Sequence, residues 1–570
     1  MSVKTTCVLS VVGVTLLGVC GAHTGVLAAS ADMPNCSVAA LAALDVPDVT
    51  IMSAAVVPAS AQNPEYCDVI GAVTTRGAGA GPGEARFHAQ LPAAWNHKYL
   101  ATGPGGVSGN FFPSMNPLDV ATSIRKGYAF VTNDTGHQSA FFDAGWALTA
   151  PHVPDKPKLV DWFYRAQHQV AVATKALVTA FYAEGPVEYS YFDGCSNAGR
   201  NALIEAARYP DDYDGIIAGA PYVDQRGNQL WGYKNAKAFL DRDAFIQPST
   251  LPVIDAAVKA SCDGADGVVD GLIQNPAACS FDPDELVPAT LTQAQANAIK
   301  IFIRAVRDEH RRVIYPGSSI SDLSDASGFG GFIPWTERGP AIDPTSPQPW
   351  GAQPPLTWQA ADTVIRHMVV RDPDFNATLD WPETDGIVSR DAVELFDRRT
   401  SVGDANVAHD LVPYLRDGKK VILYHGYDDQ AITPYRTVWF YQDLAQIFGG
   451  YQKTQHHARL FMVPGMQHCG GGAGPNSVDT LTALEQWVER GIAPDGLVAT
   501  KFVNDNPAQG VARTMPLCKF PEMARYRGAG DIDDAASWRC SSRDASLLHV
   551  GRNGHAAGLD DREPRARSRE

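Results

Sequence analysis

Short apolar runs that end in glycine-rich turns recur along the chain, and helical patterns separate several of them. The clearest runs span residues 98–106, 128–136, 187–194, 213–219, 419–426 and 458–465. The clearest helical patterns span residues 159–184 and 197–208. Strands that alternate with helices pair in parallel, because each crossover returns the chain to the same edge of the sheet. The alternation therefore predicts an α/β fold with a mostly parallel sheet covered by helices on both faces.

The alternation fades between residues 222 and 401, a stretch rich in Pro, Gly, Asp and Trp, and resumes at Lys419. A chain of 570 residues exceeds the roughly 250–300 residues at which single cores stop growing. We therefore predict that residues 222–401 form a lid domain inserted into a core made of residues 32–221 and 402–540. The segment 541–570 is rich in Arg and Asp and poor in apolar residues, which predicts a disordered tail.

The first 31 residues have the pattern of a secretory signal peptide. Lys4 precedes a short apolar run at 8–21, and small residues at 29–31 permit cleavage near Ala31. The run is shorter than the roughly 20 apolar residues of a membrane span. A lipoprotein signal at 17–20 is disfavoured, because the large Val19 stands before the cysteine. The protein is therefore predicted to be secreted or periplasmic, without a transmembrane segment.

Charge and cysteine content narrow the function classes. A net charge of −16 argues against a nucleic-acid partner, which requires a basic surface. Eight cysteines remain after signal cleavage, and an even number in an exported chain predicts disulfides. No CxxC spacing occurs, which argues against a zinc cluster. The eight are Cys36, Cys67, Cys195, Cys262, Cys279, Cys469, Cys518 and Cys540.

The apolar run at 187–194 leads directly into a turn that contains Ser196. Residues 194–199 are Gly-Cys-Ser-Asn-Ala-Gly, and a helical pattern follows. A serine at such an elbow projects its hydroxyl above the sheet edge, near the free amides of a helix N-terminus. Ala198 replaces the second glycine of the usual GxSxG motif, and Gly199 comes one position later. Ser196 is thus a candidate nucleophile, although such a string is also common in ordinary turns.

An acid and a base follow in the order Ser, Asp, His that is typical of α/β-hydrolases. Asp428 and Asp429 come after the apolar run 421–424, and His468 comes after the run 460–463. Both positions are therefore at the carboxyl ends of predicted strands. The residues alone leave open which aspartate acts. The other candidate bases are His425, His456 and His457.

Two cysteines favour His468 among these histidines. Cys195 immediately precedes the candidate nucleophile, and Cys469 immediately follows the candidate base. A disulfide between them would tether the serine turn to the histidine loop. The alternative is two unrelated cysteines, which the exported context disfavours.

Several separated motifs together resemble one known family. They are Gly-Cys-Ser at 194–196 with Gly-Arg at 199–200, Tyr-Asp-Gly-Ile at 213–216, Ala-Gly-Ala-Pro at 218–221, Tyr-His-Gly-Tyr-Asp-Asp at 424–429 and the pair Cys195 and Cys469. The chain from about residue 36 to 540 resembles the tannase and feruloyl esterase family, which includes the bacterial mono(2-hydroxyethyl) terephthalate hydrolase. The resemblance implies an α/β-hydrolase core with a lid, Asp429 as the acid and a Cys195–Cys469 disulfide. Ala198 is the main departure near the chemistry.

The resemblance also implies a structural calcium ion in the lid. By itself, the segment 262–272 is an acidic, glycine-rich turn and does not have EF-hand spacing. Ca²⁺ takes six to eight oxygen ligands, which carboxylates and carbonyls supply. The expected ligands are Asp263, Asp266 and Asp270 with the carbonyls of Val268 and Leu272. No organic cofactor is expected. The remaining cysteines are expected to pair as Cys36–Cys67, Cys262–Cys279 and Cys518–Cys540.

Backbone amides are expected to bind the oxyanion. One is that of Asn197, the residue after the nucleophile, and the other comes from the glycine loop 103–106, where Gly106 is favoured over Gly105. An ordinary strand-to-helix turn is the alternative interpretation of this loop.

The predicted activity is hydrolysis of aromatic-acid esters through an acyl-enzyme on Ser196. Feruloyl esters are the first choice, possibly borne by plant polysaccharide or polyphenol; galloyl esters and terephthalate monoesters are the alternatives. A protein of another class, an inactive hydrolase fold that only binds a ligand, stays open. Lid side chains decide the substrate, and the candidates are Trp335, Trp358, Arg366 and Arg371.

Overall fold

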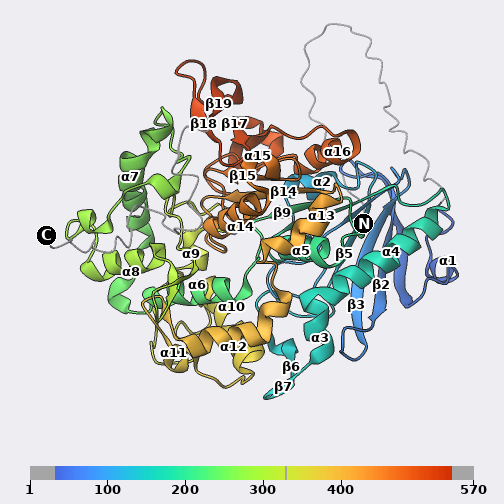
Figure 1. Ribbon diagram of the computed structural model, residues 1–570, viewed down its shortest axis with the longest axis horizontal. Helices are drawn as coiled ribbons and strands as arrows, with labels where there is room; N and C mark the ends of the chain where they lie inside the picture. Colours follow the sequence, from blue (N-terminus) through green and yellow to red (C-terminus); the bar gives the residue numbers. More distant parts are fainter. Residues whose placement is uncertain (1–32, 328–329, 542–570) are drawn as a thin grey trace, which may run out of the picture.

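The computed structural model describes residues 33–327 and 330–541. The predicted signal peptide and the predicted tail beyond Ser541 lie outside the described residues, and both stay predictions. A nine-stranded sheet runs through the molecule in the order β1-β2-β3-β5-β4-β8-β9-β14-β15 (Figure 1). Its strands are β1 (Val49–Val57), β2 (Tyr66–Thr75), β3 (Gly83–Pro92), β4 (Lys98–Ala101), β5 (Ala129–Asn133), β8 (Tyr189–Cys195), β9 (Gly215–Gly219), β14 (Lys420–Gly426) and β15 (Ala458–Val463).

The strands that the sequence predicted form the parallel part of the sheet, and strands that it did not predict form an antiparallel part. Each of the six predicted runs overlaps one of the strands β4, β5, β8, β9, β14 and β15, and the five pairings among these strands are parallel. The strands β1, β2 and β3, together with β5, pair antiparallel at one edge. The prediction of a mostly parallel sheet is confirmed, and the antiparallel edge is an addition that it missed.

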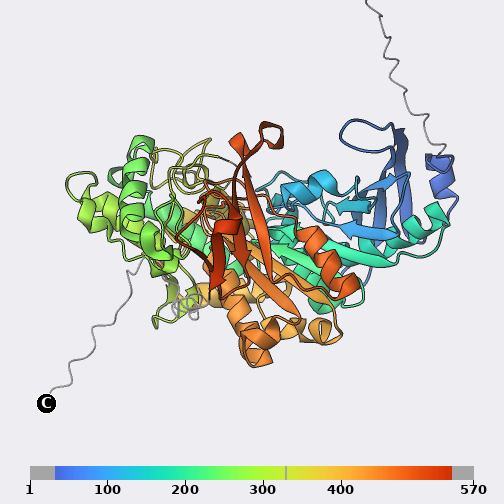
Figure 2. The ribbon, with the colours of Figure 1, turned by 90° about the horizontal axis from the view of Figure 1, so that it is seen from above.

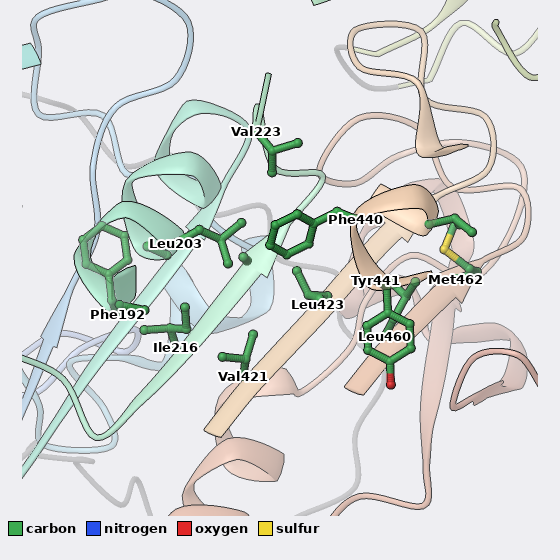
Figure 3. Packing of buried hydrophobic residues seen from close by; sticks show 14 of the residues in the cluster. Phe192, Leu203, Ile216, Val223, Val421, Leu423, Phe440, Tyr441, Leu460 and Met462 are labelled. Carbon is green, nitrogen blue, oxygen red and sulfur yellow. The ribbon is translucent and has the colours of Figure 1, made fainter. Parts of the chain in front are cut away.

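Helices cover both faces of the sheet. One face packs against α4 (Ala166–Tyr182), α5 (Asn197–Arg208) and α14 (Pro434–Phe448), and the other packs against α16 (Thr480–Arg490). In Figure 3, Ile216 and Leu423 of the sheet lie on the side where Leu203 of α5 and Phe440 of α14 pack. The neighbouring strand residue Ile422 points to the opposite face, into the cluster that contains Leu484 and Trp487 of α16. This two-residue alternation buries the strands on both sides, as the continuous apolar runs require.

The helical pattern predicted over 159–184 is interrupted near its start. It comprises α3 (Lys156–Val160), a π-helical turn at Asp161–Arg165 and then α4. The buried guanidinium of Arg165 donates to Asp161 and to the carbonyls of Gly77 and Gly81. The wide turn therefore coincides with a charged contact that joins the helix to the loop before β3.

Residues 222–401 gather on one side of the sheet, in green and yellow on the left of Figure 1 and again in Figure 2. A small four-stranded sheet in the order β11-β10-β13-β12 lies within this segment. Its strands and the helices of the segment are β10 (Val306–Asp308), β11 (Val313–Tyr315), β12 (Glu383–Thr384), β13 (Ile387–Val388), α6 (Gln225–Ala238), α7 (Leu251–Cys262), α8 (Gln293–Ile303), α9 (Phe332–Trp335), α10 (Leu356–Val364), α11 (Ala377–Asp380) and α12 (Arg390–Thr400). The exact domain boundaries stay a prediction.

The remaining elements are short or lie at the edges of the core. Two-stranded sheets form from β6 with β7, β16 with β17 and β18 with β19. No helix in the described residues is long and apolar enough to cross a bilayer. The bounds are α1 (Val38–Ala42), α2 (Pro117–Thr122), α13 (Val412–Arg416), α15 (Tyr451–Thr454), β6 (Leu148–Ala150), β7 (Val153–Pro154), β16 (Gly496–Phe502), β17 (Val511–Cys518), β18 (Met523–Tyr526) and β19 (Trp538–Ser541).

Candidate active site

Ser196 lies at the junction between β8 and α5, in a backbone conformation that side chains rarely adopt. Its φ is +65° and its ψ is −127°, and Asn197 begins the helix. The amide of Ser196 donates to the carbonyl of Gly219 at 2.9 Å, and its carbonyl accepts from the amide of Tyr222 at 3.0 Å. The neighbouring strand end therefore holds the strained turn from both sides, as expected for a nucleophile elbow.

The alanine at position 198 does not disturb this elbow, because the tight contact falls one residue later. A Cβ atom on Gly199 would lie 2.7 Å from the carbonyl oxygen of Gly219 and 3.1 Å from the Cα of Pro221. A Cβ on Gly194 would lie 2.3 Å from the carbonyl oxygen of Ala198. The close helix–strand packing thus needs glycine at 194 and 199 and accommodates the methyl group of Ala198.

His468 and Asp429 meet across the ends of β15 and β14. The Nδ1 of His468 lies 2.7 Å from Oδ2 of Asp429, and the other carboxylate oxygen accepts from the amides of Ala431 at 2.8 Å and Ile432 at 2.9 Å. Burial alone would raise the pKa of Asp429. The charge and hydrogen bond of His468, together with those of His425, outweigh burial and hold that pKa below its usual range. Asp429 is therefore a buried anion that orients an imidazole.

The other candidates occupy different places. Asp428 is buried and accepts from the hydroxyl of Ser321; burial, and then the charge of Asp322, raises its pKa well above its usual range. His425 also contacts Asp429, with its Nε2 3.0 Å from Oδ2, but its side chain is fully buried and its Nδ1 is bonded to Thr437. From the sequence, His425 was expected only as an alternative to His468 as the base. The structure places it as a second partner of the acid.

The remaining two rivals lie at the other end of the sheet, just before β15 begins. His456 and His457 belong to the turn between α15 and β15, whereas the nucleophile elbow lies at the carboxyl end of β8. Parallel strands place their carboxyl ends along one edge. Neither histidine is therefore placed to receive a proton from Ser196.

A disulfide joins the residue before Ser196 to the residue after His468. Cys195 and Cys469 are bonded, with their Cα atoms 5.9 Å apart. In the described residues no hydrogen bond joins Ser196 Oγ to His468, and such bonds commonly tighten only in the substrate complex. The covalent link therefore constrains how far the two side chains can separate. The structure also forms the other three expected pairs, Cys36–Cys67, Cys262–Cys279 and Cys518–Cys540.

Two backbone amides beside Ser196 are free. Those of Asn197 and Gly106 donate to no acceptor in the described residues. Asn197 fixes the glycine loop to the elbow, because its Nδ2 donates to the carbonyl of Pro104 at 3.2 Å. Gly106 has a φ of +61°, and a Cβ there would lie 2.6 Å from the carbonyl oxygen of Phe141. Gly106, and not Gly105, lines the cleft that contains Ser196.

The enclosed part of this cleft is small, about 40 Å³, and the space that includes its open mouth is about 410 Å³. Its walls are mostly apolar, and the Trp335 ring lies 5.9 Å from the His468 ring in an edge-to-face arrangement. The apolar walls are Val107, Phe141, Phe142, Trp335, Ala360, Ala431 and Ile432. Besides Ser196 and Asn197, the neutral polar groups are those of Tyr222, Asn228 and Gln229, and no described lining residue is Lys, Arg or His.

Of the four lid candidates, only Trp335 lines the cleft. Trp358 is almost fully buried and packs against Tyr233 of α6. Arg366 pairs with Asp362 one helical turn away at 2.7 Å. Arg371 ends the helical segment after α10 and does not line the cleft. The sequence did not identify Tyr222, Asn228 or Gln229, because Asn228 and Gln229 reach the cleft through the packing of α6 and Tyr222 lies in the segment between β9 and α6.

The predicted calcium ligands form a compact acidic turn after α7. Asp263 and Asp266 are 2% and 3% exposed, and one carboxylate oxygen of Asp266 has no hydrogen-bond partner in the described residues. Burial, with the charges of Asp270 and Asp263, raises the pKa of Asp266 to about 7. The buried, unpartnered oxygen of Asp266 beside two other carboxylates is what a hard cation site would require. Arg513 already binds one of these carboxylates, that of Asp270.

Known proteins resemble this chain over most of its length. A family model described as tannase and feruloyl esterase matches residues 67–541. An uncharacterised esterase of Xanthomonas campestris is 32% identical over 88% of this chain and 90% of its own length. The mono(2-hydroxyethyl) terephthalate hydrolase of Piscinibacter sakaiensis is 31% identical over 84% of this chain and 85% of its own.

A solved structure agrees with these relatives. The crystal structure of an esterase from Aspergillus oryzae superposes with a TM-score of 0.73 at 25% identity and covers 89% of this chain and 100% of that one. This similarity, with the helix-covered sheet, confirms the predicted α/β-hydrolase fold class. The chain belongs to the tannase and feruloyl esterase family and is an esterase.

Proposed function

We propose that the protein hydrolyses aromatic carboxylic esters with Ser196 as nucleophile, His468 as general base and Asp429 as the residue that orients the base. The observation that carries this proposal is the 2.7 Å contact between His468 and Asp429, on a loop that a disulfide ties to the serine elbow. A base needs a partner that fixes its tautomer and stabilises its charged form, and a buried carboxylate does both.

In the proposed reaction, Ser196 Oγ bonds to the ester carbonyl carbon and its proton passes to Nε2 of His468. The amides of Asn197 and Gly106 stabilise the negative oxygen that results. The bond to the alcohol oxygen then breaks, and His468 returns the proton to the departing alkoxide. Water attacks the acyl-enzyme by the same route, gives its proton to His468 and releases the acid and free Ser196.

The favoured acyl group is a hydroxycinnamate such as ferulate. Aromatic side chains of the cleft can pack on a planar ring, and the Tyr222, Asn228 and Gln229 groups can bond to its phenol and methoxy oxygens. A galloyl ester fits the same chemistry and is the second candidate. A terephthalate monoester is disfavoured, because its free carboxylate needs a cation and the described lining residues include none. The ester is proposed to be a small molecule or a group attached to plant polysaccharide or polyphenol.

We further propose that the protein is secreted and binds a structural calcium ion. The sequence pattern of residues 1–31 and the four disulfides support export. Asp263, Asp266 and Asp270 would hold the ion with the carbonyls of Val268 and Leu272. Bound Ca²⁺ would neutralise the crowded carboxylates and brace the turn, and it would take no part in the reaction.

Turnover of methyl ferulate, methyl gallate and a terephthalate monoester, measured side by side, tests the proposed function. We expect the highest kcat/KM on methyl ferulate and its loss in Ser196→Ala. Ser114→Ala is a matched control, because Ser114 donates to the Cys195 carbonyl beside the elbow but has no role in the chemistry. Full activity in Ser196→Ala would refute the assignment. No activity of the wild type on any ester, with binding retained, would favour the ligand-binding alternative.

A further inference from the structure

A cluster of potential metal ligands lies on the face of the core where α4 and α5 pack. His168 belongs to α4, Glu205 to the last turn of α5, and Asp212 to the loop that leads into β9. Each side chain offers one ligand atom, and the three atoms lie within 4.8 Å of one another. The cluster is distinct from the acidic turn of the lid and from the catalytic cleft.

Glu205 is the feature that ordinary packing does not explain. It is 0% exposed, and in the described residues neither carboxylate oxygen accepts a hydrogen bond from an N–H or hydroxyl group; its carboxyl group lies against that of Asp212. An ionised carboxylate buried without a partner is strongly destabilising, so a bound cation or a proton must compensate it.

The imidazole of His168 is held beside the two acids. Its ring stacks on that of Tyr209 at 3.8 Å with an interplanar angle of 4°, and its Nδ1 lies 2.6 Å from Oδ2 of Asp212. The side chains of His168 and Asp212 are 29% and 12% exposed, so an ion could enter from solvent. One end of the cluster is thus accessible and the other is buried.

Two lysines approach the cluster, but neither neutralises the carboxylates directly. Lys175 donates to the backbone carbonyl of Asp212, and its ammonium lies 4.6 Å from the centre of the Tyr213 ring. Lys419 donates to the carbonyl of Pro210. In the described part of the chain, no ion pair joins either lysine to Glu205 or Asp212. In the described residues, the Glu205 carboxyl group therefore has no counter-charge at its own oxygens, and Asp212 has only the imidazole of His168.

We propose that His168, Glu205 and Asp212 bind a divalent transition metal ion of the zinc type. One imidazole nitrogen and two carboxylate oxygens, with water in the remaining position, match the ligand preferences of Zn²⁺. Calcium, which takes six to eight oxygens, does not fit this set. The ion fixes the far end of α5, about 12 Å along the helix from Asn197, and its role is structural.

The test uses the mature protein without a polyhistidine tag, freed of metal by chelation. Titration with Zn²⁺ by calorimetry, and with Co²⁺ by visible absorption, both in saturating Ca²⁺ so that the acidic turn of the lid is filled, should show one site per chain, and Zn²⁺ should raise the Tm. Glu205→Gln, which keeps the side-chain shape, and His168→Gln, at the exposed end, should each weaken Zn²⁺ binding at least tenfold. Asp211→Asn, which is exposed beside Asp212 but is not one of the three proposed ligands, is the matched control and should leave it unchanged.

Two results would overturn the proposal. One is the absence of Zn²⁺ binding, or equal binding in wild type and both variants. The other is a wild-type Tm that Zn²⁺ does not change while Glu205→Gln raises the Tm of the metal-free protein, since Glu205 and Asp212 would then share a proton in place of a metal.

Discussion

Removing the Cys195–Cys469 disulfide should lower both stability and turnover. The two cysteines are 274 residues apart, and the chain-entropy relation for a loop of that length gives about 5.6 kcal/mol at 25 °C. This figure is an upper limit, because the Cys262–Cys279 bond already shortens the loop. Loss of the link also frees the His468 loop relative to Ser196, and a displacement of about 1 Å costs roughly 10²-fold in rate.

The double variant Cys195→Ala/Cys469→Ala should therefore unfold at lower denaturant concentration and show a kcat on methyl ferulate lowered by about ten- to a hundredfold. Cys518→Ala/Cys540→Ala is the control. Its 22-residue separation gives about 3.4 kcal/mol by the same relation, and this pair joins β17 to β19 in a hydrophobic cluster separate from the one that contains Cys195. It should lose stability but keep kcat.

Guanidinium unfolding gives the free energies, and initial rates well below both transitions give kcat. The reasoning is refuted if the Cys195/Cys469 variant keeps wild-type kcat while it loses stability. The disulfide would then stabilise the fold without positioning the histidine.

Three further perturbations test the role of Asp429, the need for glycine at position 199 and the calcium site of the lid. Asp429→Asn should lower kcat by about 10⁴-fold, because the amide favours the wrong tautomer of His468. The pKa of Asp429 is depressed in the folded protein, so its contribution to stability should be present at neutral pH and decline as the pH falls below about 4. A stability difference between wild type and variant that does not change with pH would contradict this. Gly199→Ala should lower the free energy of unfolding by about 1–3 kcal/mol, because its methyl group clashes with the Gly219 carbonyl. Ala198→Gly should keep kcat. If denaturant unfolding shows the same loss of stability for both variants, glycine is not required specifically at position 199. EDTA should lower the Tm of the wild type, and Asp266→Asn should abolish that shift; no shift, with no calcium by elemental analysis, would exclude the lid site.

The parallel half of the sheet was predictable because its strands are buried on both faces. Strands such as β9 and β14 are continuous apolar runs that end in glycine, and they stand out in the sequence. β1 alternates between exposed and half-buried residues and lies at the sheet edge, so its pattern resembles that of a loop. The helix predicted over 159–184 was right in position, but the π turn depends on Arg165 reaching a distant loop, which no local pattern specifies.

The site divides in the same way. Ser196 and His468 each follow a strand and each stand next to a cysteine, so the sequence predicted that they lie close together. The second contact of Asp429, made by His425, was not expected, although both residues belong to one short motif. The neutral groups of the cleft come from α6 (Asn228 and Gln229) and from Tyr222 just before it, and their place depends on how this segment packs over the elbow. Sequence reasoning therefore predicted Ser196, His468 and Asp429 as a triad, while the residues that line the cleft became visible only in the fold.

The proposal that Ser196 is the nucleophile is tested most directly by identifying the residue that carries the acyl group during turnover. The protein is mixed with methyl ferulate, quenched within a single turnover and digested, and the peptides are analysed by mass spectrometry. We predict a feruloyl adduct on Ser196, absent from Ser196→Ala. An adduct on another residue, or turnover of the ester by Ser196→Ala at the wild-type rate, would contradict the account.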